Sequence, residues 1–225
     1  EKLVARLDGT HKVLFPEIDG TFPNHHPNPV EPETLELLRA EVAAAGADLG
    51  IGFDGDGDRI GVIDSTGRQV PGDLLTAFLA KDVAARHPGA PILLDVKSSE
   101  AALRLVESAG AAAQIWKTGH SHMKKRMKEL EAPLAGEMSG HIFIADDYLG
   151  FDDAIYAGVR VITQMVKGGQ SITEFMDSLP EQHATPELRI DCPDTVKFDS
   201  MEKIRAHVLS GHDAANVNSI DGVRV

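Results

Sequence analysis

Residues 48–63 read DLGIGFDGDGDRIGVI, two apolar runs that enclose a loop in which every second residue is aspartate. The runs at 48–53 and 60–63 are short and apolar, which favours strands over helices. A turn is predicted at Ser65-Thr66-Gly67, directly after the second run. We therefore predict that the two runs pair through the acidic loop, within a chain in which strands and helices alternate.

The sequence before this pair of strands predicts a short helix, a strand-like run and a long loop. Apolar residues in 2–7 have helical spacing, and 12–15 form an apolar run. Five prolines follow between residues 16 and 32, and proline is excluded from helix interiors and central strands. A helix is predicted from Glu33, with Gly46 as the residue that ends it.

The sequence after the turn repeats the alternation of helices and strands. The Pro71-Gly72 pair predicts a domain boundary, giving units at 1–70, 71–183 and 184–225. The alternation predicts an α/β fold, with the first two units built as βαβ elements. The predicted helices are 73–86, 100–108, one around the basic residues 124–128, 152–166, 172–179 and 200–209; the predicted strands are 92–96, 114–116, 142–145, 188–190 and 217–225.

Composition and charge exclude several functional classes. The chain has 225 residues, of which 42% are hydrophobic, and a formal charge of −13. Such a charge disfavours nucleic-acid and membrane partners, because it repels phosphate groups. The single cysteine, Cys192, cannot form an internal disulfide or a thiolate cluster, and we expect a cytoplasmic protein. The helical spacing at the very start and the missing initial Met indicate a fragment.

The acidic loop predicts a metal site. Asp54, Asp56 and Asp58 stand at i, i+2 and i+4, a spacing that places all three carboxylates on one side of an extended segment. Three converging anions need a cation, and oxygen ligands select Mg²⁺ or Ca²⁺ over zinc. An EF-hand is excluded, because Arg59 and Ser65 occupy the places of its glycine and its glutamate. Arg59 is a candidate contact for phosphate or hydroxyl groups, or an ion-pair partner of the aspartates.

Three further polar loops carry candidate ligand contacts. Glu137, Ser139 and His141 lie among glycines before a strand, a set suited to sugar hydroxyls or to a simple turn. Lys97 and the segment Lys117-Thr118-Gly119-His120 follow predicted strands, where α/β proteins bind ligands, and could supply cationic contacts to a phosphate. A zinc site at His120-Ser121-His122 is disfavoured, because no third ligand is evident.

Taken together and in this order, the loops resemble those of the α-D-phosphohexomutases, specifically the bacterial phosphomannomutase/phosphoglucomutase branch. The resemblance runs from about Asp19 to Val225. The motifs that carry it are Asp19-Gly20 with Phe22-Pro23-Asn24-His25-His26-Pro27, then Asp54-Gly55-Asp56-Gly57-Asp58-Arg59, Lys117-Thr118-Gly119-His120 and Gly136-Glu137-Met138-Ser139-Gly140.

The resemblance implies a four-domain enzyme that interconverts hexose 1-phosphate and hexose 6-phosphate, of mannose or glucose, through a bisphosphate intermediate. It implies consecutive α/β/α sandwich domains with mixed sheets, followed by the start of a smaller α+β domain. By this resemblance Mg²⁺ is held by the three loop aspartates, and Glu137 and Ser139 hold the sugar hydroxyls. Arg59, Lys97, His120 and His141 contact the phosphosugar, with Arg59 and His141 as possible aids to proton transfer.

Two elements of the family pattern are absent from this sequence, the phosphoserine motif and the Arg/Ser-rich phosphate-binding loop expected in the fourth domain. The phosphoserine motif, of Ser-His-Asn-Pro type, has no match here, so we expect the chain alone to be inactive. We interpret the chain as most of a second domain, a whole third domain and the beginning of a fourth. The alternative is a non-catalytic module that binds Mg²⁺, Ca²⁺ or a phosphosugar.

Overall fold

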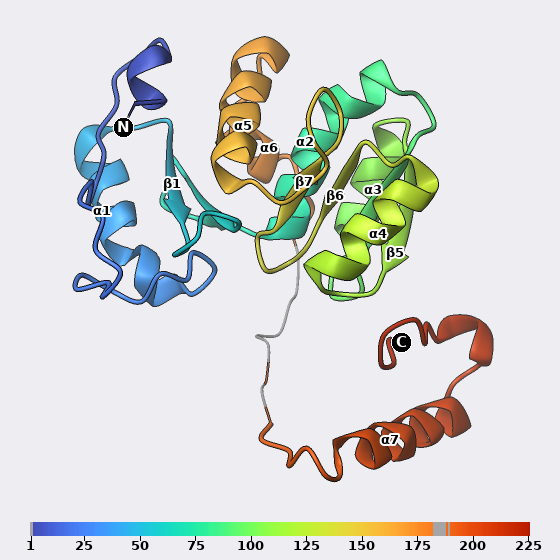
Figure 1. The fold of residues 1–225 in the computed structure, drawn as a ribbon. Helices are drawn as coiled ribbons and strands as arrows, with labels where there is room; N and C mark the ends of the chain where they lie inside the picture. The colour runs from blue at the N-terminus through green and yellow to red at the C-terminus, as the bar shows by residue number, and fades with distance from the viewer. Residues whose placement is uncertain (1, 182–187, 189) are drawn as a thin grey trace.

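The computed structural model describes residues 2–181, 188 and 190–225. Within them, two sheets pack against a common layer of helices (Figure 1). The first sheet is antiparallel, in the order β1 (Leu49–Phe53), β2 (Ile60–Asp64) and β3 (Gln69–Val70). The second is mixed, in the order β5 (Ala112–Trp116), β4 (Pro91–Asp95), β6 (Leu134–Gly136) and β7 (Ile142–Ile144). Strands β5, β4 and β6 are parallel, and β7 is antiparallel to β6.

Helices cover both faces of the second sheet, which makes it an α/β/α sandwich. Helices α2 (Gly72–Arg86) and α3 (Glu100–Ser108) enclose one core, which Ile92 and Leu94 of β4 enter. Leu93 points the other way, into a second core with Met123 and Met127 of α4 (His120–Leu130). This alternation is what a strand buried on both faces requires.

The first sheet lies between helix α1 (Glu36–Ala45) and helix α5 (Ala154–Gly168). Ile63 packs against α1, whereas Ile60 and Val62 face the large core that also contains α2 and α5. All five residues of β2 are buried. The predicted boundary at residue 71 therefore lies inside a shared hydrophobic core, to which both units contribute.

The remaining elements are helix α6 (Ile172–Asp177), helix α7 (Lys197–Gly211) and three short 3₁₀ turns, at Val4–Arg6, Pro32–Leu35 and Ala214–Asn216. In Figure 1, α7 stands apart from the two sheets. In the described part of the chain, no helix has the length and apolar character needed to cross a bilayer.

Several predicted elements agree closely with the structure. The hairpin pairs as expected, from Leu49 opposite Asp64 to Phe53 opposite Ile60. Helix α3 has the predicted bounds, and Gly46 ends α1 in the left-handed conformation with φ of 60°. Glycine is favoured there because it has no Cβ to clash with the backbone.

Other predictions are wrong. The first unit is antiparallel throughout its described strands and is not a βαβ element, because the two runs are joined by a short loop that cannot make a crossover. Residues 12–15 form no strand: Val13 and Phe15 remain 41% exposed, and no neighbouring strand takes up their backbone hydrogen bonds. The helix expected over 2–7 is the single turn Val4–Arg6.

The C-terminal unit also differs from expectation. Residues 217–225 make one isolated bridge, between Asn218 and Arg224, instead of a strand. The strand predicted at 188–190 includes residue 189 and so lies partly outside the described residues. Strands β3 and β6 were not predicted, because two or three residues are too few to show a periodicity.

Candidate functional site

The acidic loop is organised by Asp54, which is 9% exposed. Its Oδ1 accepts hydrogen bonds from the backbone N–H groups of Gly57, Asp58 and Arg59 at 3.0–3.1 Å. Its Oδ2 accepts one from the Nε of Arg59 at 2.8 Å. Burial alone would raise the pKa of Asp54, but the hydrogen bonds from Arg59 lower it. This carboxylate therefore stays ionised and fixes the loop around itself.

The three loop aspartates form one cluster of anionic oxygens. One carboxylate oxygen each from Asp54, Asp56 and Asp58 lies within 4.8 Å of the others. Burial and the neighbouring carboxylates of Asp54, Asp56 and Asp152 raise the pKa of Asp58 to about 6. A divalent cation would relieve this repulsion, so the donor set fits a hard metal ion.

Arg59 is held by the scaffold on two sides. Besides Asp54, it donates from Nη1 to the Oδ1 of Asn28 at 3.1 Å, and Asn28 belongs to the proline-rich segment. The guanidinium thereby links Asn28 of the proline-rich segment to the acidic loop. The structure shows Arg59 as an ion-pair partner of Asp54 and Asp58, and its contact with a phosphate or hydroxyl group stays a prediction.

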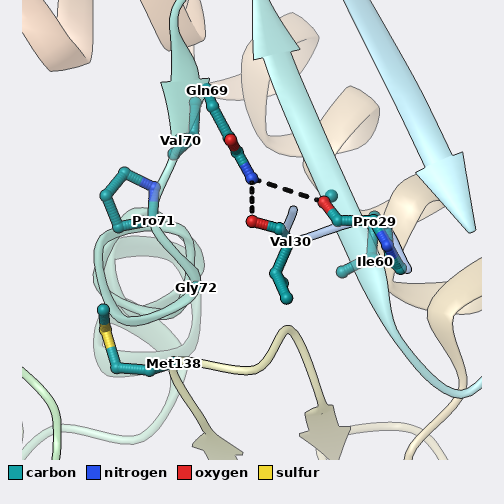
Figure 2. A pocket seen from close by; sticks show the side chains of 9 residues that line it. Pro29, Val30, Ile60, Gln69, Val70, Pro71, Gly72 and Met138 are labelled. Atoms are coloured by element: carbon teal, nitrogen blue, oxygen red, sulfur yellow. Dashed lines mark hydrogen bonds between the residues drawn. The ribbon is translucent and has the colours of Figure 1, made fainter. Parts of the chain in front are cut away.

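A cleft of about 230 Å³ lies next to this segment (Figure 2). The side-chain amide of Gln69 donates to the carbonyl oxygens of Val30 and Pro29, at 3.0 and 3.4 Å, across one side of the cleft. Its lining is mostly apolar and includes none of the candidate ligand residues: Pro29, Val30, Ile60, Gly61, Gln69, Val70, Pro71, Gly72 and Met138. The candidate ligand residues therefore lie outside the lining of this cleft.

The recognition loop, residues 136–141, brings three predicted side chains together. Glu137 is 2% exposed, and its Oε1 accepts a hydrogen bond from the backbone N–H of Gly119 at 2.9 Å. The hydroxyl of Ser139 lies 3.2 Å from the other Glu137 oxygen and 2.8 Å from Nδ1 of His141. Burial raises the pKa of Glu137 and lowers that of His141.

Backbone contacts join the recognition loop to the acidic loop. The N–H of Ile60 donates to the carbonyl oxygen of Gly140 at 3.0 Å, and Arg59 forms a β-bridge with His141. Gly140 has φ of 89°, and a Cβ there would lie 2.5 Å from the Ile60 carbonyl oxygen. The contact also brings Nε2 of His141 to 3.4 Å from an oxygen of Asp58. The two loops therefore form one continuous site.

His120 and Lys97 differ in their relation to this site. His120 is exposed at the start of α4, and its ring stacks on that of His141 with centroids 6.3 Å apart. Lys97 is exposed in the loop after β4, and its positive charge opposes the raising of the pKa of Asp95 by burial. The structure thus groups His120 with the recognition loop and leaves Lys97 at its edge.

Sequence reasoning missed two buried carboxylates. Asp95, fully buried at the end of β4, contacts three loops through Ser98 Oγ at 2.7 Å, Thr118 Oγ1 at 3.3 Å and Met138 N at 3.4 Å. Burial raises its pKa. The only signal for it in the sequence was an acid at the end of an apolar strand.

Asp152 was predicted only as the beginning of a helix. Its Oδ1 accepts a hydrogen bond from Lys124 Nζ at 2.9 Å, while its buried Oδ2 has no hydrogen-bond partner within the described structure and lies 4.0 Å from His141 Nε2. The following residue, Asp153, caps α5 instead. Ligand atoms of Asp58, His141 and Asp152 also lie within 4.8 Å of one another.

Two family descriptions match this chain. Residues 2–67 match "Phosphoglucomutase/phosphomannomutase, alpha/beta/alpha domain II", and residues 71–183 match "alpha/beta/alpha domain III" of the same family. The chain belongs to the phosphoglucomutase/phosphomannomutase family. This confirms the resemblance seen in the motifs and the α/β/α architecture expected from it.

Similar proteins carry names from this family. A phosphomannomutase/phosphoglucomutase of Pseudomonas putida is 48% identical over 94% of this chain and 45% of its own length, and one of Pseudomonas aeruginosa is 43% identical over 100% and 48%. A Burkholderia thailandensis crystal structure of a phosphoglucomutase/phosphomannomutase family protein has a TM-score of 0.81 at 41% identity, covering 94% of this chain and 44% of that one. The chain spans about half the length of the curated relatives it matches.

Membership of the phosphoglucomutase/phosphomannomutase family bears on the acidic loop, because this family generally uses a metal cofactor. The cluster of three carboxylates and the raised pKa of Asp58 fit that expectation. The same chemistry disfavours zinc, since the ligands are oxygens rather than thiolates.

Proposed function

We propose that this chain is part of a phosphohexomutase that interconverts hexose 1-phosphate and hexose 6-phosphate of mannose or glucose. The observation that carries the proposal is the backbone bridge between the acidic loop and the recognition loop, at Ile60 and Gly140. It couples a cation site to a set of hydroxyl-binding groups, which is the combination that a phosphosugar requires. The names of the relatives support the same assignment.

Asp54, Asp56 and Asp58 are the proposed ligands of Mg²⁺. When bound, the ion supplies positive charge that stabilises the equatorial oxygens of a transferring phosphoryl group. Asp54 also holds the loop in shape through its three backbone hydrogen bonds. Asp58 also contacts the recognition loop, with one carboxylate oxygen 3.4 Å from Nε2 of His141.

Glu137 and Ser139 are the proposed contacts for the sugar hydroxyls. A carboxylate accepts hydrogen bonds and a hydroxyl both donates and accepts, so together they can pair with two neighbouring hydroxyls. His141 keeps its ring fixed between Ser139 and Asp58, and burial lowers its pKa, which favours the neutral form that can take up a proton from a sugar hydroxyl. Arg59, His120 and Lys97 complete the proposed phosphosugar surroundings.

The proposed nucleophile of the reaction is a phosphoserine that this sequence does not contain in the family's motif. We therefore expect residues 1–225 to bind ligands without turnover. Sustained conversion of glucose 1-phosphate by the purified chain, with contaminating enzymes excluded, would contradict this division of roles. We further propose that the functional units divide at residue 71 and near residue 184, and that the protein acts in the cytoplasm, which its single cysteine favours.

Isothermal titration calorimetry with Mg²⁺ tests the metal site. Asp56→Asn removes one of three anionic ligands and should weaken Mg²⁺ binding by about tenfold or more. Asp48→Asn is the matched control, because it removes the same charge from an exposed position at the other end of β1. Equal Mg²⁺ affinity for Asp56→Asn and Asp48→Asn would overturn the assignment.

A further inference from the structure

A second pocket, of about 190 Å³ and with a polar lining, lies between the end of β5 and helix α4. Its lining is Trp116, Lys117, His122, Lys125, Arg126 and Glu129, and we call it the α4 pocket. Three of these side chains are cationic and one is anionic. A local excess of positive charge is unusual in a chain of formal charge −13.

The cations of the α4 pocket are only partly neutralised. Glu129 pairs with Arg126 at 3.1 Å and with neither lysine. Within the described residues, the ammonium groups of Lys117 and Lys125 make no ion pair. Lys124, the neighbour on the same helix, instead pairs with Asp152 at 2.9 Å. The two free ammonium groups are therefore available to an anionic ligand.

Arg126 is fixed in place before any ligand binds. Its guanidinium lies 4.3 Å over the ring of Trp116, which itself packs against the core beneath α4. Its Nε is buried without a hydrogen-bond partner in the described structure, and its Nη1 holds Glu129. A guanidinium has five N–H donors in fixed directions, so the pocket offers a preorganised set of donors.

We propose that the α4 pocket binds a phosphate group, either as inorganic phosphate or as the phosphate monoester of a small metabolite. Lys117 and Lys125 supply charge, Arg126 supplies fixed donors, and His122 adds a ring nitrogen. A dianion suits three cations opposed by one carboxylate, whereas a neutral sugar would gain little from this lining. The extension to phosphosugars rests on the proposed function; binding of inorganic phosphate does not.

The pocket adjoins the candidate active site through one short segment. Lys117 is followed by Thr118, whose hydroxyl donates to Asp95, and by Gly119, whose backbone N–H donates to Glu137. A phosphate bound at Lys117 would lie at the outer end of this segment. The α4 pocket is thus placed to concentrate phosphorylated ligands beside a site that is itself rich in carboxylates.

The fluorescence of Trp116 reports on this pocket directly, because it is the only tryptophan in the chain. The intact chain is titrated with inorganic phosphate at constant ionic strength, set by sodium chloride. We expect a saturable change in Trp116 emission. The double variant Lys117→Gln/Lys125→Gln should weaken phosphate binding at least about tenfold, since it removes both unpaired charges.

Lys128→Gln is the matched control, since Lys128 lies on the same helix outside the pocket lining. It should change phosphate affinity by less than about twofold. A loss equal to that of the double variant, or no emission change beyond that of chloride, would overturn the proposal. Glucose and glucose 6-phosphate are then compared.

Binding of glucose 6-phosphate with no response to glucose supports a phosphate site, and an equal response to both sugars overturns it. If Asp56→Asn binds Mg²⁺ as tightly as Asp48→Asn, the mutase proposal is overturned. The expected binding of phosphate at the α4 pocket does not depend on that result.

Discussion

The acidic loop and the recognition loop lie side by side, but they are held in different ways. In the acidic loop, Asp54 accepts hydrogen bonds from residues three to five positions further along the same loop. In the recognition loop, Glu137 is held by Gly119, and Gly140 by Ile60, which is 80 residues away in the sequence. The first loop is held mainly by hydrogen bonds within itself, whereas the second is held by two other segments of the chain.

This difference predicts which changes each loop tolerates. Substitution of Asp56 should act mainly on cation binding, because the loop is shaped by hydrogen bonds to Asp54 rather than to Asp56. A substitution in the recognition loop should act on stability as well, because its backbone contacts join the two sheets. Four predictions test this contrast, in order of decreasing expected effect.

The largest effect is expected for Gly140→Ala. The new Cβ would lie 2.5 Å from the carbonyl oxygen of Ile60, at a residue with φ of 89°. Clash and backbone strain together should lower the free energy of unfolding by roughly 3–5 kcal/mol. Gly57→Ala is the control in the acidic loop: its φ is 79°, but no atom lies within 4 Å of its Cβ, so it should cost about 1–2 kcal/mol. Equal losses in urea unfolding would refute the contrast.

Asp95→Ala should have the next largest effect. It leaves the hydroxyls of Ser98 and Thr118 and the backbone N–H of Met138 without their buried acceptor. We expect the free energy of unfolding to fall by roughly 2–4 kcal/mol, with Mg²⁺ affinity unchanged. Urea unfolding and calorimetry on the same sample measure both. A loss below about 1 kcal/mol would show that Asp95 does not organise the three loops.

Glu137→Ala should weaken catalysis by a mutase-active protein that contains this chain. Loss of a buried hydroxyl partner costs on the order of 1–3 kcal/mol in kcat/KM. Mannose and glucose phosphates should be affected alike, because they share the 3- and 4-hydroxyl arrangement and differ at carbon 2. Mg²⁺ affinity should not change. If kcat/KM stays within about twofold of wild type, Glu137 has only a structural role.

The smallest expected effect is the pH dependence of Mg²⁺ binding. Since the pKa of Asp58 is raised to about 6, its proton competes with the cation below that pH, and apparent Mg²⁺ affinity should fall by about tenfold per pH unit. Without Mg²⁺, the raised pKa of Asp58 should lower the free energy of unfolding as pH rises from about 4 to 6. Over this range Asp58 ionises in the unfolded chain first, since burial and the neighbouring carboxylates oppose its ionisation in the folded protein. Calorimetry between pH 5 and 7 tests this; a flat profile contradicts it.

The same contrast explains what the sequence could predict. The aspartate spacing at 54–58 and the cap at Gly46 depend on neighbouring residues, so pattern reasoning identified them. Asp95 and Asp152 were missed because their contacts, with Met138 and His141, arise only when β4, β6 and α5 are packed together. The βαβ element expected in the first unit was wrong because alternation of helices and strands indicates elements but not which of them pair, although the hairpin across the acidic loop was predicted correctly.

The bridge between Ile60 and Gly140 has a consequence for chimeric proteins assembled from relatives of this chain. The hydrogen bond joins main-chain atoms of both residues, so most substitutions of neighbouring side chains should leave it in place. A hybrid that takes residues before Pro71 from one parent and those after it from another should retain the alignment of both loops, provided the second parent has glycine at position 140. A crossover at residue 71 keeps this bridge but divides the shared core between the two parents, so it should succeed best when both parents have matching core residues in β2, α2 and α5.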